Sequence, residues 1–262
     1  MFLPNKIYDL LLNRSIQIHT ISCPVEEFKS VKNLNELNGF MISHLKDGLA
    51  FLKLFFWLEK NLNSKELTEL KISEKLYELR SLEDTFICES FATISAFNDN
   101  AAIIHYKANK FLEKKLDSDG LYLIDAGAHY LEGTTDTTRT IKIGKVSSEM
   151  INDYTLVLKG HIAIATAVFP INTKGKEIDA LARKALWSEG KDYAHGTGHG
   201  VGSLLNVHEG PISISKNSEC YISNGMVISN EPGYYKSGEY GIRIENLEVV
   251  SKKYFKNSKN FL

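Results

Sequence analysis

The sequence predicts an α+β protein in which a curved antiparallel sheet is covered by helices. In the first third of the chain, apolar residues recur at helical spacing. After Phe91, short β-branched and aromatic runs are separated by Gly, Asp and Asn, which is typical of strands and turns. Because helical and strand-like segments are grouped and do not strictly alternate, the pattern favours this class over a parallel α/β fold.

Residues from about 25 to 83 have the pattern of helices. Ser30 or Asn33 is the expected N-cap of the first one. Its apolar residues at helical spacing include Leu34, Leu37, Phe40, Met41 and Leu45. The run 48–58 is the most apolar of the chain, but a bilayer span needs about 20 residues. We therefore interpret it as a buried helix face, and we expect a second helix at 65–82.

The remaining elements follow in three groups. Strand-like runs occupy 101–106, 121–130 and 138–144. Two helical windows come next, Ser147–Phe169, which ends at Pro170, and Gly175–Gly190. The last group is strand-like again, at 225–235 and 240–250, and residues 236–239 are the expected hairpin turn between them.

Composition excludes several classes of function. The 262 residues carry 31 Lys and Arg against 32 Asp and Glu, so the chain lacks the basic excess of a nucleic-acid-binding protein. Three widely spaced cysteines, Cys23, Cys88 and Cys220, form neither a disulfide framework nor a CxxC metal site. The N-terminus lacks the apolar core of a signal peptide. We expect a cytoplasmic protein with no nucleic-acid or membrane partner.

Five polar residues interrupt segments in which strand periodicity requires apolar ones. They are Asp125, Asp136, His199, Glu231 and Glu245. Burying an isolated carboxylate costs several kcal/mol, and four close together would repel one another. Two divalent cations would cancel four carboxylates. This oxygen-rich set favours Mn²⁺, with Zn²⁺, Co²⁺ or Fe²⁺ as alternatives.

The spacing of these residues supports one shared site. Asp125 and Asp136 are eleven residues apart, and Glu231 and Glu245 are fourteen apart, so each pair fits the two strands of a hairpin. His199 lies in a Gly-rich stretch that we interpret as a loop running into a strand. Taken singly, each residue has a plainer interpretation, such as a turn carboxylate, a surface pair of Glu245 with Arg243, or a hydrogen-bonded core histidine.

Several ordered motifs resemble the catalytic domain of Xaa-Pro aminopeptidases. They are DAGAHYLEGTTDTTRT (125–140), HGTGHGVGSLLNVHEGP (195–211), SNEPGYY (229–235) and GIRIEN (241–246). The resemblance begins near residue 28 and continues to 250. It implies the pita-bread fold, also used by methionine aminopeptidase, prolidase and creatinase. We expect a catalytic domain at 28–262, with residues 1–27 as the tail of a preceding domain.

The same resemblance implies a pair of metal ions. Asp136 and Glu245 would bridge the ions, Asp125 would complete the shell of one, and His199 and Glu231 that of the other. A hydroxide held between the ions would be the nucleophile. Glu231 would also move a proton from that water toward the leaving nitrogen.

Five further residues match positions of the family. His105 and His208 would stabilise the anion that forms at the scissile carbonyl. His195 would help form the pocket for the residue after the scissile bond, and Arg243 would orient Asp136 through a bidentate pair. Phe91 would form an apolar wall for a proline ring, with ordinary core as its alternative.

The function implied is hydrolysis of the bond between an N-terminal residue and a following proline by a dinuclear metal-dependent aminopeptidase. The partners would be peptides with proline at the second position. A homodimer is a further expectation, which the sequence does not decide. The alternatives are a methionine aminopeptidase, a prolidase-type peptidase, or a truncated and weakly active metal- or peptide-binding module.

Overall fold

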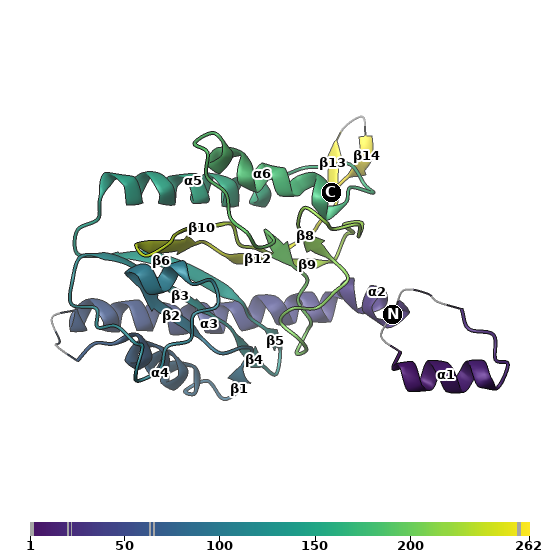
Figure 1. The fold of residues 1–262 in the computed structure, drawn as a ribbon, viewed down its shortest axis with the longest axis horizontal. Helices are drawn as coiled ribbons and strands as arrows, with labels where there is room; N and C mark the ends of the chain where they lie inside the picture. The colour runs from purple at the N-terminus through teal and green to yellow at the C-terminus, as the bar shows by residue number, and fades with distance from the viewer. Residues whose placement is uncertain (1–2, 20, 22, 63, 65, 256–257) are drawn as a thin grey trace.

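The computed structural model describes residues 3–19, 21, 23–62, 64, 66–255 and 258–262. In Figure 1 the central strands lie between helices α3 (Leu34–Asn61) and α4 (Glu69–Arg80) on one side and helices α5 (Ser148–Ala165) and α6 (Gly175–Trp187) on the other, while the last two strands of the chain stand at the end marked C. Every strand pairing between the named strands is antiparallel. The predicted α+β class is therefore confirmed.

The long helix α3 (Leu34–Asn61) forms one wall of the molecule. Asn33 caps it, because its side chain accepts from the Glu36 backbone N–H while the Glu36 carboxylate accepts from the Asn33 N–H. The run 48–58 buries Ala50, Phe51, Leu54 and Leu58 in the core, as expected.

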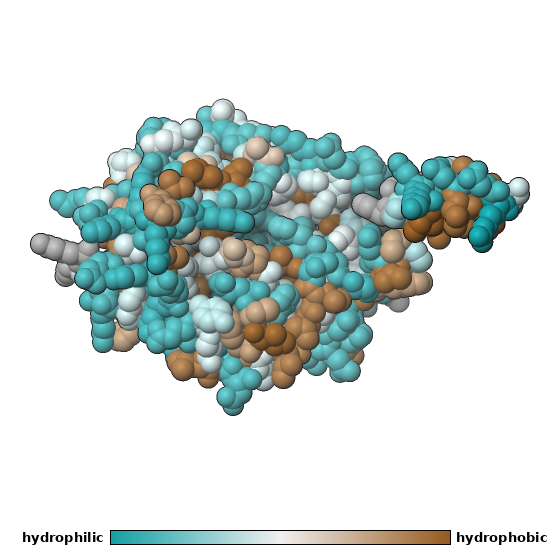
Figure 2. Space-filling model, turned by 60° about the horizontal axis from the view of Figure 1, so that its bottom comes forward, coloured by the Kyte–Doolittle hydropathy of each residue, from teal (hydrophilic) through white to brown (hydrophobic). Residues whose placement is uncertain are grey.

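Phe40 of α3 is buried in a separate cluster with Val201 and Val227, but other apolar residues of the helix stay exposed. Leu34 and Leu45 are 78% and 76% exposed, and Met41 is also exposed. Apolar side chains gather on this surface and on α1 in Figure 2. The helical spacing predicted the helix correctly, but it did not show which of its faces is buried.

The N-terminal helices lie at one end of the molecule. Helix α1 (Asn5–Asn13) has no buried residue and stands apart from the body (Figure 1). Helix α2 (Pro24–Ser30) contacts the body, where Lys29 Nζ lies 2.8 Å from Glu209 Oε1. The expected boundary at residue 27 therefore falls inside α2, and the division into a tail and a catalytic domain stays a prediction.

Helix α4 (Glu69–Arg80) begins after the Thr68 cap, whose side chain accepts from the Lys71 N–H. It is shorter than the predicted 65–82, and Lys65 lies outside the described residues.

Two three-stranded sheets follow α4. One has the order β2 (Ile94–Phe97), β3 (Gly120–Ala126), β6 (Thr137–Ile143). The other has the order β1 (Phe86–Glu89), β4 (Ala128–Tyr130), β5 (Gly133–Thr134). Strands β4 and β5, which lie between β3 and β6 in the sequence, thus form a separate hairpin. The pairing of β3 with β6 continues up to Ala126 and Thr137.

The strand expected at 101–106 is absent from the structure. Asn98, at a φ of +52°, opens the short 3-10 helix η1 (Asn98–Ala102), and turns follow it. Tyr106 is buried and donates to Glu69 Oε2 across 2.8 Å. The β-branched residues predicted a strand, but η1 packs against β11 and no strand pairs with this segment.

Helices α5 (Ser148–Ala165) and α6 (Gly175–Trp187) cover the other side of the strands. Ser147 caps α5, which ends four residues before the predicted Phe169. The two helices approach closely at Gly160, where a Cβ would lie 2.2 Å from the Ala182 carbonyl oxygen.

Short strands complete the chain. They are β7 (Gly198–His199), β8 (Ser213–Ile214), β9 (Val227–Asn230), β10 (Gly233–Lys236), β11 (Tyr240–Arg243), β12 (Asn246–Val249), β13 (Lys253–Phe255) and β14 (Ser258–Phe261). The predicted β10–β11 hairpin is present, with Gly238 at a φ of +74° in its turn. None of the helices in the described ranges is long and apolar enough to cross a bilayer.

Candidate metal centre

One cavity of about 770 Å³ collects every site residue that the sequence predicted. Its lining includes Phe91, His105, Asp125, Asp136, His195, His199, His208, Glu231, Arg243 and Glu245. These residues come from segments up to 154 positions apart, since Phe91 and Glu245 share the same cavity. The tertiary structure therefore assembles the motifs into one site.

The first pair of carboxylates is positioned by β3 and β6. Asp125 lies in β3 opposite Thr138 of β6, and Asp136 directly precedes β6. Gly127 allows the chain to turn between them, because a Cβ there would lie 2.0 Å from the Thr135 carbonyl oxygen.

A buried ion pair braces this turn from the side of α3 and α4. Arg80 Nε and Nη2 donate to the two carboxylate oxygens of Asp47 across 2.7 and 2.9 Å, and Arg80 Nη1 donates to the Gly127 carbonyl. Asp47 also accepts from the hydroxyl groups of Tyr130 and Thr135. Because both charged groups are almost fully buried and fully hydrogen-bonded, they hold the β3–β6 connection in a defined position.

The second pair of carboxylates flanks the open end of the β10–β11 hairpin. Gly233 of β10 pairs with Arg243 of β11 there. Glu231 lies two residues before Gly233, and Glu245 lies two residues after Arg243. The Glu245 backbone N–H donates to the Thr138 carbonyl, and the Thr138 hydroxyl donates to Glu245 Oε2 across 2.6 Å. These bonds bring the two hairpins together.

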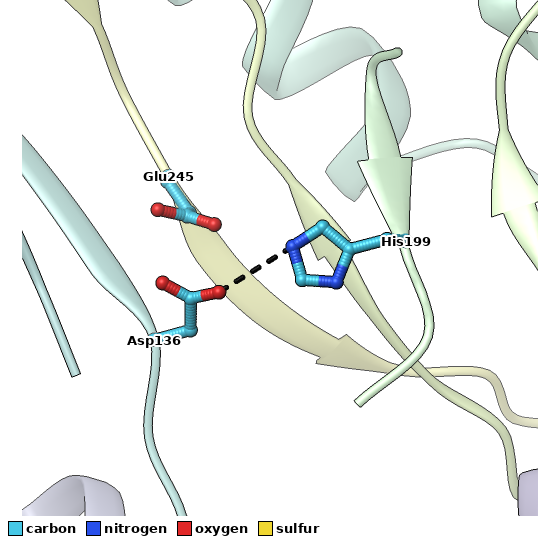
Figure 3. Close-up of side chains that lie close together, drawn as sticks. All are labelled: Asp136, His199 and Glu245. Carbon is cyan, nitrogen blue, oxygen red and sulfur yellow. Dashed lines mark ion pairs between the residues drawn. The ribbon is translucent and has the colours of Figure 1, made fainter. Parts of the chain in front are cut away.

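His199 reaches the carboxylates from β7. Its Nδ1 is 2.9 Å from the Gly200 carbonyl oxygen, an acceptor, so Nδ1 carries the hydrogen. Nε2 then faces the cluster, 3.4 Å from Asp136 Oδ2 and 3.2 Å from Glu231 Oε1. Ligand atoms of Asp136, His199 and Glu245 all lie within 4.8 Å of one another. Figure 3 shows the three side chains pointing toward one another.

The cluster concentrates negative charge in a buried place. Burial and the nearby Asp125 and Glu231 raise the pKa of Asp136 to about 7, although the hydrogen bond from His199 opposes this shift. Burial and the neighbouring carboxylates also raise the pKa of Glu245. Burial lowers the pKa of His199, but its hydrogen bonds with Asp136 and Glu231 outweigh that effect and raise it well above 6.5. Protons thus offset the charge when no cation is present.

The donor set fits divalent cations. Asp125 Oδ1 is buried and has no hydrogen-bond partner among the described residues, so it is an acceptor left for another group. Four carboxylates are hard ligands and one imidazole nitrogen is a borderline one. The structure brings ligand atoms of Asp136, His199 and Glu245 together, while Asp125 and Glu231 line the same cavity beside them.

Arg243 corrects one prediction. Its Nη2 donates to Asp125 Oδ2 across 2.5 Å, and not to Asp136. The reason is the packing of β11 against β3, which carries Asp125, whereas Asp136 stands before the start of β6 and faces His199. Arg243 Nη1 donates to the Tyr235 hydroxyl across 2.8 Å.

The remaining predicted residues surround the carboxylates. His195 Nε2 lies 2.8 Å from the Tyr235 hydroxyl, and the His208 ring stands perpendicular to that of His199, 4.0 Å away. Burial lowers the pKa of His208, and the His199 charge adds to this effect. His105 and Phe91 line the cavity, with His105 exposed to solvent.

Three residues that hold site side chains in place were not predicted from the sequence. Tyr235 joins His195 to Arg243, and Thr138 holds Glu245. Ser229 Oγ accepts from the His199 N–H and donates to Glu231 Oε1 across 3.1 Å. All three lie inside motifs already recognised, and a polar residue near a ligand in a buried strand was the available signal.

Comparison with known proteins supports the family resemblance. The family model of metallopeptidase family M24 matches residues 41–252. A probable Xaa-Pro aminopeptidase P from Paracoccidioides brasiliensis is 50% identical over 243 residues, which are 91% of this chain and 39% of that protein. A relative of the same description from Colletotrichum graminicola is 47% identical over 92% of this chain and 40% of its own length.

Solved structures show the same architecture. An X-prolyl aminopeptidase from Caenorhabditis elegans, described as a cytosolic enzyme with a di-nuclear active site, matches with a TM-score of 0.88 and 42% identity, over 95% of this chain and 41% of that one. Prolidase from Pyrococcus furiosus matches with a TM-score of 0.79 and 25% identity, over 95% and 71%. The expected pita-bread fold is thereby confirmed.

This chain spans about two fifths of the length of the curated relatives it matches. The match to the family model nevertheless covers most of the chain, including all five residues of the candidate metal centre. The chain belongs to metallopeptidase family M24.

Proposed function

We propose that this chain is a dinuclear metalloaminopeptidase that removes an N-terminal residue preceding proline. The observation that carries the proposal is the convergence of four carboxylates and the Nε2 of His199 in one cavity. The names of the relatives support the choice of Xaa-Pro bonds.

Asp125, Asp136, His199, Glu231 and Glu245 would hold two divalent ions, with Asp136 and Glu245 shared between them. The oxygen-rich donor set favours Mn²⁺, and Zn²⁺, Co²⁺ or Fe²⁺ are the alternatives. When bound, the ions would polarise the peptide carbonyl and lower the pKa of water.

Glu231 is the proposed proton acceptor. Burial by itself would raise the pKa of its carboxyl. The hydrogen bond and charge of His199 outweigh burial, and the charges of His195 and Arg243 add to their effect, so the pKa lies below its usual value. Glu231 is therefore ionised at neutral pH and able to accept a proton at a carboxylate oxygen. It would pass that proton to the leaving nitrogen.

The histidines would bind and orient the substrate. Neutral His208, together with His105, would donate to the carbonyl oxygen as negative charge develops on it. His195 is held between the Gly196 carbonyl and the Tyr235 hydroxyl and would contact the residue after the scissile bond. Phe91 would pack against the proline ring, whose tertiary amide has no N–H to satisfy.

The proposed partners are peptides with proline at the second position. We also propose a cytoplasmic location, in keeping with a structural neighbour that is described as cytosolic. A homodimer is compatible with the exposed apolar residues of α3. We also propose that the catalytic domain begins at residue 28, after the tail formed by residues 1–27.

The test is Mn²⁺-dependent release of the first residue from Arg-Pro-Pro, Met-Ala-Ser and the dipeptide Arg-Pro, with Glu231→Gln as the matched control. We expect cleavage of Arg-Pro-Pro alone, lost in the control. Cleavage of Met-Ala-Ser alone would overturn the Xaa-Pro assignment in favour of a methionine aminopeptidase. Cleavage of only the dipeptide would indicate a prolidase. Mn²⁺ binding with no hydrolysis of any peptide would indicate a binding module.

A further inference from the structure

His161 of α5 lies directly behind the candidate metal centre without lining its cavity. The side chain is buried, and its two ring nitrogens contact the residues adjacent to two predicted ligands. Nδ1 is 3.0 Å from the carbonyl oxygen of Asn230, which precedes Glu231. Nε2 is 3.1 Å from the amide nitrogen of Asn246, which follows Glu245.

The strand geometry explains why one histidine reaches both positions. Asn230 and Asn246 are register partners of the antiparallel pair β9–β12. Successive side chains in a strand point to opposite faces. Glu231 and Glu245 face the cavity, so their neighbours face α5. His161 therefore holds both ligand-bearing segments from the rear.

The hydrogen-bond pattern selects one state of the imidazole. The Asn230 carbonyl is an acceptor, so Nδ1 carries the hydrogen. Arg139 Nη2 donates to Asn246 Oδ1 across 2.8 Å, which turns the Asn246 amide nitrogen toward Nε2. Nε2 is thus an acceptor, and the ring is neutral. Burial lowers the pKa of His161, and the Arg139 charge also opposes protonation.

The network extends to the first pair of strands. Arg139, in β6, also donates from Nη1 to the Glu245 carbonyl across 2.6 Å. Asn230 Nδ2 donates both to the His161 carbonyl and to Glu248 Oε1. Helix α5 is thereby joined to β6, β9 and β12 through polar bonds at the level of the metal centre, and an apolar side chain at 161 would leave buried partners unsatisfied.

We infer that His161 is a positioning residue of the metal centre, which sets the separation of Glu231 and Glu245 through Asn230 and Asn246. Groups that hydrogen-bond directly to a metal ligand typically change metal affinity by about 10- to 100-fold when replaced. His161 acts through the neighbours of the ligands, so its replacement should have a smaller, several-fold effect. The inference rests on the proposed function, because it assumes that Glu231 and Glu245 bind the ions.

The test compares His161→Phe, which keeps a planar ring without polar atoms, with His161→Gln, whose amide presents a donor and an acceptor. His129→Phe is the control, since the His129 ring forms one hydrogen bond among the described residues, with Thr134 Oγ1. Mn²⁺ affinity is measured by calorimetry and the coupling of the two ions by electron paramagnetic resonance. We expect several-fold weaker binding, up to about 10-fold, and an altered spectrum in His161→Phe, recovery to near the wild-type affinity in His161→Gln, and no change in the control.

Wild-type affinity and an unchanged spectrum in folded His161→Phe would overturn the inference. Equal loss in His161→Gln and His161→Phe would also overturn it, because it would show a packing role. If His161→Phe does not fold, Asn246→Ala replaces it, and several-fold weaker binding is then required. If the wild-type chain itself binds no Mn²⁺, the proposed function fails instead.

Discussion

Arg243 Nη2 donates to Asp125 Oδ2 across 2.5 Å, and the Arg243 side chain is 3% exposed. This bond places the one arginine of the cavity lining against the carboxylate at the edge of the cluster. The other arm of Arg243 reaches Tyr235, which in turn contacts His195. Arg243 therefore links the predicted ligands to the predicted substrate pocket.

Replacing Arg243 by Gln should weaken both metal binding and folding. The variant leaves Asp125 buried among carboxylates without its cation, and breaking a buried ion pair typically costs about 3–5 kcal/mol. Urea unfolding in the presence of a chelator measures the stability, and calorimetry measures Mn²⁺ affinity. Tyr235→Phe is the control: it removes the hydroxyl's hydrogen bonds to Arg243 and His195 but keeps the ion pair, and it should cost less, about 2 kcal/mol. Equal stability of Arg243→Gln and wild type would refute the role assigned to this pair.

The metal-free chain should lose stability as the pH rises from 6.5 to 8.5. Asp136 has its pKa raised from 3.8 to about 7, so its contribution is fully present below pH 4 and falls between pH 4 and pH 7, with only its last part lost above pH 6.5. His199, whose pKa is raised well above 6.5, loses its contribution in the range above pH 6.5. Glu245, whose pKa is also raised, acts in the same direction. Histidines with lowered pKa values act in the opposite direction, but below about pH 6.5.

Thermal unfolding with and without Mn²⁺ measures this dependence. The gain in Tm from Mn²⁺ should be larger at pH 8.5 than at pH 6.5, because the ions replace protons that the cluster has already lost. Glu245→Gln should flatten the pH dependence of the metal-free chain, since it removes one of the charges acting on Asp136. A gain from Mn²⁺ that does not change with pH would contradict this account.

Gly127→Ala should disrupt the first pair of ligands. The new methyl group would lie 2.0 Å from the Thr135 carbonyl oxygen and 2.3 Å from Ser90 Oγ, so the backbone between Asp125 and Asp136 must shift. We expect lower stability and weaker Mn²⁺ binding. Gly48→Ala in α3 is the matched control, with open space around its Cβ, and it should stabilise the helix by about 0.5–1 kcal/mol. Similar effects of the two substitutions would show that the close approach is unimportant.

Asp47→Asn should destabilise the chain by about 3–5 kcal/mol, because it leaves the Arg80 guanidinium buried without a counter-charge. Chemical unfolding monitored by circular dichroism gives the value. Lys71→Ala breaks an exposed pair with Glu66 and should produce little change. A small effect of Asp47→Asn would mean that Arg80 finds another partner.

The sequence was sufficient for the fold class and for the set of residues at the centre. Burying carboxylates in strands that should be apolar costs free energy unless cations compensate their charge. This cost made Asp125, Asp136, Glu231 and Glu245 recognisable from the sequence as candidate metal ligands. The ordered motifs implied the pita-bread fold through their resemblance to a known family, and the hairpin spacing supported one shared site. Local signals also predicted the turn before β11 and a helix cap at Ser30 or Asn33, of which the structure has Asn33.

Only the tertiary structure decided the relationships between segments. The exposed face of α3 and the missing strand at 101–106 depend on which neighbours are available to pack. The partner of Arg243 depends on the packing of β11 against β3. His161 had no role in the sequence, because its neighbours Asn230 and Asn246 are 69 and 85 residues away. Residue type and spacing report local chemistry, whereas contacts between distant strands exist only once the chain has folded.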